Sequence, residues 1–245
     1  MHNDVLANKN CLITGSTGGI GKHLAFIFAE SGVNLFLTST NTKSLQTLKS
    51  SIKKKFPKSD VSTYPADLKK SSDFTKLVNT VRNKFGTIDI LINSAGFYRD
   101  NSLIKTSLDE FDNTFSINVR APFVLSHEFA KDMIKKKWGR IVNIGSSSAY
   151  AGKPEHPAYA ASKHALLGLS KSLTKDLRRF NVRVFFVSPG PVKTKMAARW
   201  AKAAKNQKYE TFIDPKEFSI FVRDLIKADS NMFIEEVRMC RMNED

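Results

Sequence analysis

Short apolar runs and longer amphipathic stretches alternate along almost the whole chain. The apolar runs are of the length expected for buried strands and lie at residues 11–14, 33–38, 61–64, 88–93, 139–145, 181–188 and 232–237. Stretches with helical spacing lie at 19–31, 42–55, 70–84, 107–116, 118–137, 157–180 and 215–228. This alternation predicts an α/β fold, a doubly wound parallel sheet of about seven strands with helices on both faces.

Nothing in the pattern divides the chain into separate domains. No linker, internal repeat or low-complexity segment interrupts the alternation, so we expect one domain over residues 1–245. The alternation blurs only after Met196, where we expect a short, mobile helical flap near 191–214 that covers a substrate. A short flap favours a small or extended substrate.

Composition narrows the class of protein. Hydrophobic residues make up 41% and charged residues 25% of the 245 positions, which are ordinary globular values. No apolar run reaches the roughly 18 residues of a membrane-spanning helix, and the first ten residues lack the apolar core of a signal peptide. We therefore expect a cytoplasmic protein without a membrane partner. Cys11 and Cys240 are too few for a disulfide framework or a metal site, so we interpret both as packing residues.

The chain is strongly basic, with 39 Lys and Arg against 23 Asp and Glu and a formal charge of +16. Such a balance is typical of proteins with an anionic partner, such as nucleic acid, an acidic carrier protein or a phosphorylated substrate. The lysine clusters, however, lie on or beside predicted helices, away from glycine-rich or aromatic loops. We interpret them as solvated helix faces and expect no nucleic-acid partner.

The segment "TGSTGGIG", residues 14–21, joins the first predicted strand to the first predicted helix. Glycines in such a turn permit positive φ angles and let a pyrophosphate approach the backbone, while the helix N-terminus points N–H groups at the charge. Gly15, Gly19 and Gly21 fit these roles. Glycine-rich turns also occur for purely conformational reasons, so the segment alone leaves both interpretations open.

A second group of residues lies far along the chain. Tyr159 and Lys163 are four residues apart on a predicted helix and therefore share a face. Ser146 lies thirteen residues before Tyr159, at the end of a predicted strand. The sequence therefore has two clusters of chemically active residues that follow predicted strands, namely this group and the glycine-rich segment.

With these residues the sequence resembles the short-chain dehydrogenase/reductase family, in its shorter single-domain subtype. The resemblance covers nearly the whole chain and rests on motifs in the family's order: "TGSTGGIG", "ADL" with Asp67, "NSAG" from Asn93 to Gly96, "SINV" with Asn118, Ser146, "YAASK" and "SPGPVKT" from Ser188 to Thr194. It implies a Rossmann-type fold and an NAD(P)(H)-dependent oxidoreductase that interconverts a carbonyl and a secondary alcohol.

The resemblance also implies a role for each catalytic residue. Tyr159 exchanges a proton with the substrate oxygen, and Lys163 favours its phenolate, because a phenol with a pKa of about 10 ionises poorly at neutral pH. Ser146 donates a hydrogen bond where charge develops on that oxygen. Asn118 holds a helix kink and a water that links Lys163 to solvent.

Cofactor contacts follow from the same motifs. The expected cofactor-binding residues are Gly15, Ser16, Thr17, Gly19, Ile20, Gly21, Ser39, Thr40, Asn41, Asp67, Leu68, Asn93, Ala95, Gly96, Tyr159, Lys163, Pro189, Gly190, Val192 and Thr194. The second strand ends "LFLTSTN" without the acidic residue that repels a 2′-phosphate, which favours NADP(H) over NAD(H). Many NADP-using relatives carry a basic residue at the position of Gly18 or Thr40. This chain has none at either position, so hydroxyl and amide groups would bind the phosphate.

Substrate contacts are expected in loops that follow strand ends. The candidates are Phe97, Tyr98, Ser146, Tyr150, His156, Pro191, Met196 and Trp200. His156 is also a candidate second acid/base group, but the sequence shows no partner for it, so we interpret it as an exposed loop residue.

Two alternatives stay open. The segments "GRIVNIGS" and "TSTN" are similar to bacterial 3-oxoacyl thioester reductases, and we expect Lys136, Lys137, Arg178 and Arg179 near the pocket mouth, where they would suit an acidic acyl carrier protein. Those reductases usually close with a Gly-Gly segment, whereas this chain ends "FIEEVRMCRMNED". The other alternative is a non-catalytic dinucleotide-binding regulator, against which the intact catalytic set argues.

The resemblance finally implies an oligomer. In this family the helices near 118–137 and 157–180 pair across a two-fold axis. Phe123, Leu166, Leu169 and Leu173 would otherwise form exposed apolar stripes, so we expect at least a homodimer and leave a homotetramer open.

Overall fold

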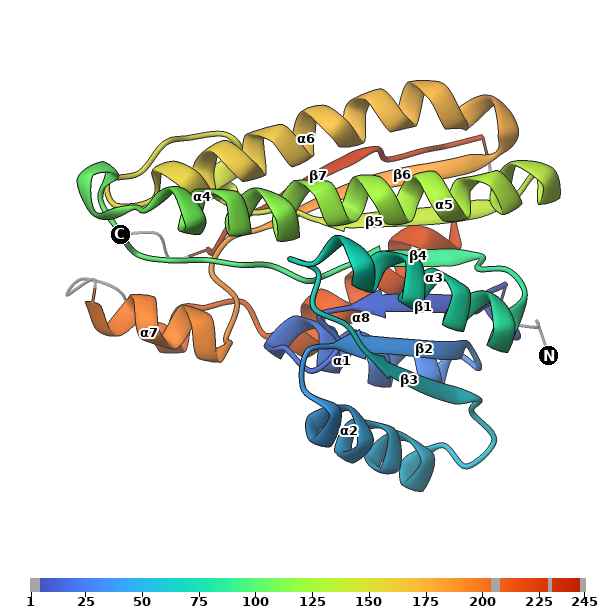
Figure 1. The fold of residues 1–245 in the computed structure, drawn as a ribbon. Coiled ribbons are helices and arrows are strands. Elements are labelled where there is room, and N and C mark those ends of the chain that lie inside the picture. Colours follow the sequence, from blue (N-terminus) through green and yellow to red (C-terminus); the bar gives the residue numbers. More distant parts are fainter. Residues whose placement is uncertain (1–4, 204–207, 229–230, 243–245) are drawn as a thin grey trace.

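One parallel sheet organises the molecule. The computed structural model describes residues 5–203, 208–228 and 231–242, and its seven strands follow the order β3-β2-β1-β4-β5-β6-β7 (Figure 1). The strands are β1 (Asn10–Thr14), β2 (Asn34–Ser39), β3 (Val61–Pro65), β4 (Ile90–Asn93), β5 (Gly139–Ile144), β6 (Val182–Pro189) and β7 (Glu236–Met239). The predicted doubly wound parallel sheet is confirmed.

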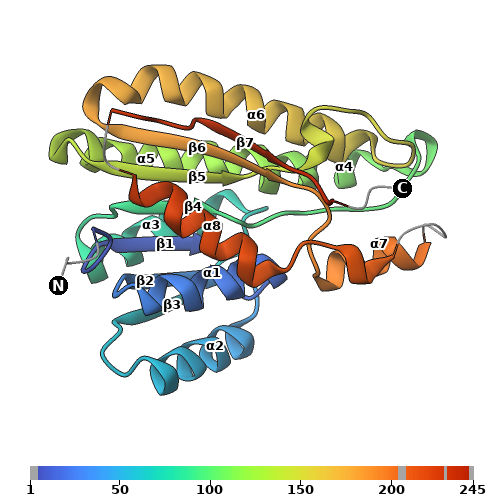
Figure 2. The ribbon, with the colours of Figure 1, turned by 180° about the vertical axis from the view of Figure 1, so that it is seen from behind.

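Helices cover both faces of this sheet. They are α1 (Gly19–Glu30), α2 (Thr42–Lys55), α3 (Ser71–Phe85), α4 (Leu108–Phe115), α5 (Ala121–Lys136), α6 (Pro157–Leu177), α7 (Lys195–Ala203) and α8 (Pro215–Lys227). Helices α1, α2 and α8 pack on one face, and α3, α5 and α6 on the other (Figures 1 and 2). None of the helices within the described ranges is long and apolar enough to cross a lipid bilayer.

The core consists of two apolar layers, one on each face of the sheet. Successive residues of a strand point to opposite faces, so Cys11 and Ile13 of β1 pack with α1 while Leu12 packs on the other side. Strands covered on both faces are mostly apolar, which is why their positions were readable from the sequence. Cys11 is buried as expected, but Cys240 is exposed beyond the edge strand, so its interpretation as a packing residue is wrong.

Two expected element boundaries are also wrong. The last strand runs from Glu236 to Met239 rather than over 232–237, because its position is set by pairing with β6. The helix expected over 118–137 begins regularly only at Ala121, since Ser116–Arg120 forms a π-helical turn.

The segment expected to form a flap contains α7 and a 3₁₀ turn, Tyr209–Thr211. Its two ends are joined at the base: Lys193 N donates to Ile213 O, and Ile213 N donates to Pro191 O, each at 2.9 Å. Residues 204–207 of the expected flap lie outside the described residues, and its mobility stays a prediction.

We expected Phe123, Leu166, Leu169 and Leu173 to form exposed apolar stripes on an unpaired chain, and this prediction is wrong for the three leucines. Leu166 is 1% exposed and packs on Phe186, while Leu169 and Leu173 are partly buried against the core. These leucines lie on the side of α6 that faces the sheet. Of the four residues of the expected stripe, only Phe123, which is 51% exposed, lies open to solvent.

Candidate active site

The glycine-rich loop after β1 is built for close approach between backbone segments. Gly15 has φ +61°, and a Cβ there would lie 2.7 Å from the Cα of Ala95. A Cβ at Gly19 would lie 2.4 Å from Thr194, and one at Gly21 would lie 2.3 Å from the Gly15 carbonyl oxygen. These three positions therefore accept only glycine without rearrangement of the loop.

The first turn of α1 fits a phosphate group. Gly18 is its N-cap residue and supplies no side-chain hydrogen bond, and the turn contains no acidic residue. Its N–H groups and the positive end of the helix dipole are therefore left for an anion. The residues present thus fit the pyrophosphate of a dinucleotide.

The loop is tied to the end of β2. Ser16 Oγ donates to Thr38 O at 3.1 Å, and Thr17 Oγ1 donates to Ser39 Oγ at 2.9 Å. Ser39 accepts in this bond, so its own hydroxyl proton remains for a ligand. Asn41, also expected at the 2′-phosphate, caps α2 by accepting from Ser44 N at 2.8 Å.

The remaining cofactor candidates lie at the ends of β3, β4 and β6. Asp67 N donates to the Asp73 carboxylate at 2.9 Å, and Leu68 is buried beside it. Asn93 Nδ2 donates to Asn143 Oδ1 at 2.8 Å, which joins the ends of β4 and β5. Pro189, Gly190, Val192 and Thr194 line the cavity described below, together with Ile20 of α1.

The proposed catalytic residues meet where β5 ends and α6 begins. Ser146 lies two residues after the end of β5, and it lines the same cavity as Tyr159. Lys163 lies one turn further along α6, with Nζ 5.7 Å from the centre of the Tyr159 ring. Its ammonium donates to Ile144 O at 2.9 Å, and the residue is only 4% exposed.

Asn118 joins a loop to this helix. Its Oδ1 accepts from Phe97 N at 2.8 Å, and its Nδ2 donates to Phe97 O at 3.0 Å and to Ser162 Oγ at 2.9 Å. The π-helical turn places this side chain between the loop after β4 and α6. Asn118 thus lies against the neighbour of Lys163, while the expected water link to Lys163 stays a prediction.

Burial dominates the electrostatics of the pair. It raises the pKa of Tyr159, and the hydrogen bond with Ser146 opposes this only in part. It lowers the pKa of Lys163 to about 8. In the protein without its cofactor, burial thus sets the direction of the shift, and stabilisation of the phenolate by Lys163 in the cofactor complex stays a prediction. At neutral pH Tyr159 is protonated, the form that donates a proton in carbonyl reduction.

A cavity of about 160 Å³ opens beside Tyr159, at the carboxyl ends of β5 and β6. Six expected substrate residues line it: Tyr98, Ser146, His156, Pro191, Met196 and Trp200. Phe97 and Tyr150 do not line it, and Tyr150 OH instead donates to Glu236 at 2.7 Å. Lys153 and Ser147 also line the cavity and were missed, although both lie in the segment between Ser146 and Tyr159.

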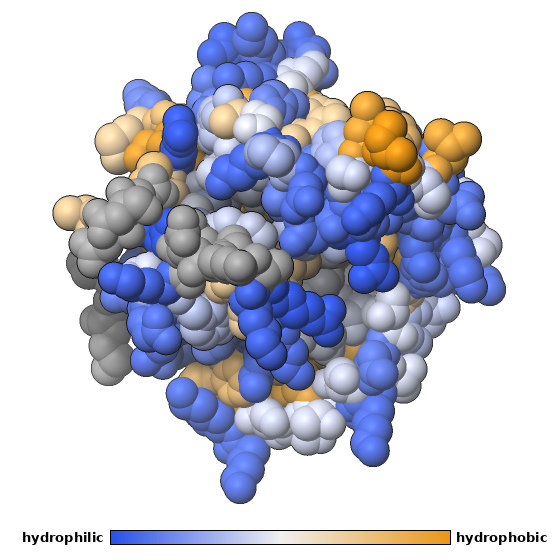
Figure 3. Space-filling model, turned by 90° about the vertical axis from the view of Figure 1, so that its left-hand side faces the viewer, coloured by the Kyte–Doolittle hydropathy of each residue, from blue (hydrophilic) through white to orange (hydrophobic). Residues whose placement is uncertain are grey.

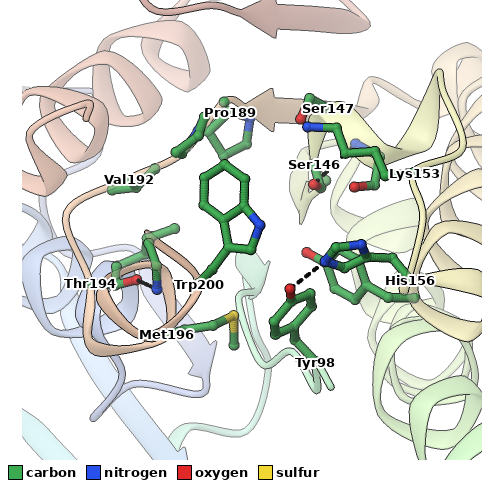
Figure 4. A pocket seen from close by; sticks show the side chains of 17 residues that line it. Tyr98, Ser146, Ser147, Lys153, His156, Pro189, Val192, Thr194, Met196 and Trp200 are labelled. Carbon is green, nitrogen blue, oxygen red and sulfur yellow. Dashed lines mark hydrogen bonds between the residues drawn. The ribbon is translucent and has the colours of Figure 1, made fainter. Parts of the chain in front are cut away.

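The cavity has two unlike walls (Figure 4). Ser146, Ser147, Lys153, His156 and Tyr98 bring polar groups to one side, which we call the polar wall. Val192, Met196 and Trp200 form the other side, the apolar wall. Lys153 reaches across the mouth, with Nζ 5.7 Å from the centre of the Trp200 ring.

The interpretation of His156 as an exposed residue without a partner is wrong. It is 9% exposed, its Nε2 is hydrogen-bonded to Tyr98 OH, and its Nδ1 to Pro154 O. A carboxylate oxygen of Asp100 lies 3.5 Å from Nε2. Only the fold brings these loops together, because Tyr98 and His156 are 58 residues apart.

The four basic residues expected at the pocket mouth lie at the opposite end of the sheet. Lys136 and Lys137 end α5 just before β5 starts, and Arg178 and Arg179 follow α6 just before β6 starts. Lys136 Nζ donates to Asp89 Oδ1 at 2.7 Å. The end of the molecule that carries α7 is nevertheless largely hydrophilic, with hydrophobic side chains in separate groups (Figure 3).

Comparison with known proteins agrees with this geometry. Residues 9–205 match the family model described as short chain dehydrogenase. A 3-oxoacyl-[acyl-carrier-protein] reductase of Buchnera aphidicola is 35% identical over 191 residues, 78% of this chain and 76% of that protein.

Two solved structures share the fold. A metagenomic short-chain oxidoreductase in complex with NADP has a TM-score of 0.82 and 28% identity, covering 96% of this chain and 99% of that one. An NAD⁺-bound xylitol dehydrogenase has a TM-score of 0.85 and 26% identity, covering 96% of this chain and 98% of that one. The chain therefore belongs to the short-chain dehydrogenase/reductase family, whose members are oxidoreductases that act on CH–OH groups with NAD(P).

Proposed function

We propose that this protein is an NADP(H)-dependent oxidoreductase that interconverts a small carbonyl compound and a secondary alcohol, with Tyr159 as its acid/base residue. One observation carries the proposal. Ser146 and Tyr159 line one cavity that adjoins the glycine-rich phosphate cradle, and buried Lys163 lies one helical turn from Tyr159. A carbonyl oxygen in this cavity would meet both hydroxyl groups.

The bound nicotinamide supplies or takes up the hydride. The side chains then manage the charge and the proton on the substrate oxygen. Ser146 donates a hydrogen bond to that oxygen as negative charge develops. Tyr159, whose pKa burial raises further above neutral pH, is protonated and donates the proton that completes the alcohol. The Lys163 ammonium stabilises the phenolate left behind and holds the ribose hydroxyls of the cofactor.

The preference for NADP(H) rests on the end of β2. Ser39 keeps a hydroxyl proton for a phosphate oxygen, and no acidic residue follows it. We expect NADPH to bind more tightly than NADH and Ser39→Asp to reverse the order, because a carboxylate repels the 2′-phosphate. Fluorescence titration of both cofactors tests this, with Ser51→Asp on the exposed face of α2 as a control of equal charge. Wild-type protein that binds NADH tenfold more tightly would contradict the preference.

The alternative substrate is a 3-oxoacyl thioester carried by an acyl carrier protein or coenzyme A. The 35% identity to a 3-oxoacyl-[acyl-carrier-protein] reductase supports it. The position of Lys136, Lys137, Arg178 and Arg179 at the far end of the sheet weakens it, because these residues are not at the cavity where an acidic carrier would dock. We therefore favour a free small-molecule carbonyl over a carrier-bound one.

We also propose a cytoplasmic homodimer or homotetramer. Exposed apolar side chains favour association of copies: Leu103, Ile104 and Leu108, before and at the start of α4, are 73%, 91% and 83% exposed. Light scattering at micromolar concentration tests this proposal, and a monomer would contradict it.

A cofactor-oxidation screen tests the function. Purified protein is mixed with NADPH or NADH and with small ketones, aldehydes, keto-sugars and acyl thioesters, and cofactor absorbance is followed. We expect substrate-dependent NADPH consumption with the free carbonyl compounds. If both cofactors bind but none is consumed with any class, the proposal fails and a non-catalytic dinucleotide-binding regulator is favoured.

A further inference from the structure

A hydrogen-bonded pair in the polar wall is not used by the proposed reaction. Tyr98 lies in the loop after β4, and His156 is the residue before α6. Their rings stack with centres 5.1 Å apart, and the Tyr98 ring also meets the Tyr159 ring edge-on with centres 5.0 Å apart. All three residues line the same cavity. The pair is therefore beside the atoms that react.

The hydrogen bonds define which atom of the pair is open to a ligand. Pro154 O can only accept, so Nδ1 of His156 carries a proton and donates to it. In the neutral ring Nε2 is then an acceptor, and Tyr98 OH donates to it. The proton of Tyr98 is thereby committed to His156. What Tyr98 can still offer to the cavity is a lone pair on its oxygen.

The surroundings keep Tyr98 in this role. Burial, followed by the negative charge of Asp100, raises the pKa of Tyr98 well above its usual range, so the side chain stays a phenol. A phenol whose proton is engaged accepts a hydrogen bond from a donor such as a hydroxyl group. On the facing side of the cavity, the side-chain hydrogen-bonding groups are the indole N–H of Trp200 and the hydroxyl group of Thr194.

We propose that Tyr98 and His156 form a hydroxyl-binding site that selects substrates with a hydroxyl group near the reacting carbon, namely hydroxyketones in reduction and diols in oxidation. The inference rests on the proposed function, because it assumes that Ser146 and Tyr159 engage the reacting oxygen. With those two groups occupied, a second substrate hydroxyl beside them meets the Tyr98 oxygen. A substrate that lacks this hydroxyl leaves the Tyr98 oxygen without a hydrogen-bond partner in the complex, which lowers the relative rate of that substrate.

The experiment compares ketones of equal size that differ in one hydroxyl group. kcat/KM of the full chain with NADPH is measured for hydroxyacetone against 2-butanone, and for 1-hydroxy-2-butanone against 3-pentanone. We expect the wild type to prefer each hydroxyketone by about tenfold, the contribution of one hydrogen bond. In Tyr98→Phe the preference should fall close to one, because kcat/KM falls more for the hydroxyketone than for the plain ketone.

Two further variants separate recognition from a structural role. His156→Leu removes the acceptor that orients the Tyr98 proton, and it should reduce the preference in the same direction. Tyr64→Phe, which removes a hydroxyl group on β3 away from the cavity, should leave the preference unchanged. Because each preference is a ratio measured on one protein sample, a partly misfolded variant does not mimic the effect.

The possible results are distinct. Equal kcat/KM for both members of each pair in the wild type overturns the inference, and so does a Tyr98→Phe variant that slows both members by the same factor. In either case NADPH is consumed, so the proposed function stands. If no carbonyl compound of any class leads to NADPH consumption, the proposed function fails and this inference fails with it.

Discussion

The two walls of the cavity are held in place by different means. On the polar wall, Ser146 lies two residues after a buried strand, and His156 is hydrogen-bonded to the backbone carbonyl of Pro154. On the apolar wall, Met196 is 43% exposed and Trp200 rests on Phe212 with ring centres 5.9 Å apart. The polar wall includes residues that follow a strand of the sheet. Met196 and Trp200 of the apolar wall lie instead on the short helix α7, in a segment whose two ends are hydrogen-bonded to each other.

This difference indicates that the two walls have different roles in catalysis and substrate binding. Proton transfer and charge stabilisation require atoms held within a fraction of an ångström, and such precision comes from side chains anchored to a sheet end. Apolar contact with a substrate tolerates looser placement, because burial of apolar area has no preferred direction. Substitution of the residues proposed to contact the reacting oxygen, Tyr159 and Ser146, should therefore change kcat strongly, and substitutions on the apolar wall should change KM weakly.

The largest effect is expected at Tyr159. Tyr159→Phe keeps the ring contact with Tyr98 but removes the proton donor, so kcat should fall by about 10²–10⁴. NADPH affinity, measured by fluorescence titration on the same sample, should barely change. Carbonyl reduction at near wild-type rate would show that another acid is used, with His156 the first to examine.

A smaller loss is expected at Ser146. Ser146→Ala removes one donor to the developing charge, which costs about 10²–10³ in kcat at comparable sites. Ser147→Ala, the next residue of the same wall, is the matched control and should cost far less. Equal losses in the two variants would contradict the specific role of Ser146.

Lys163 should give a pH-dependent effect on cofactor binding. Its pKa, lowered to about 8 by burial, means that the ammonium form is lost as the pH rises through that value. NADPH affinity should therefore weaken above about pH 8. In Lys163→Ala it should be about ten- to 100-fold weaker at pH 7, the contribution of hydrogen bonds from a charged group, and should no longer change near pH 8. Titrations from pH 6.5 to 9.5 test this, and an unaltered pH profile in the variant would contradict it.

The smallest effect is expected on the apolar wall. Trp200→Ala removes apolar contact with the substrate, so KM should rise by less than about tenfold with little change in kcat. Phe221→Ala, on an exposed face of α8 away from the cavity, is the matched control. A large loss of kcat in Trp200→Ala would show that α7 positions the reacting groups, which would remove the distinction between the walls.

Much of the fold was predictable because its strands are buried on both faces. Residues such as Leu12, Ile13 and Leu91 form short, nearly continuous apolar runs, and each run is followed by a clear helical pattern. The edge strand β7 was misplaced because Met232 and Ile234 look like strand residues but are exposed, whereas pairing with β6 places the strand at Glu236–Met239. At an edge the partner strand, rather than the local pattern, sets the register.

Relations along one helix or one turn were open to sequence analysis. Tyr159 and Lys163 share a face because a helix repeats every 3.6 residues, and the spacing of Gly15, Gly19 and Gly21 follows from the turn they form. The position of Lys136 at the far end of the sheet was also accessible in principle. A helix that ends just before a parallel strand begins must end beside the amino end of that strand.

Relations between distant segments were decided only by packing. The contact of Tyr98 with His156, the burial of Leu166 and the pKa of Lys163 each depend on which loops and helices meet in space. Local spacing carries information about residues on one element, since backbone geometry is periodic. Contacts between elements, and the desolvation that shifts a pKa, arise only when the whole chain closes around its sheet.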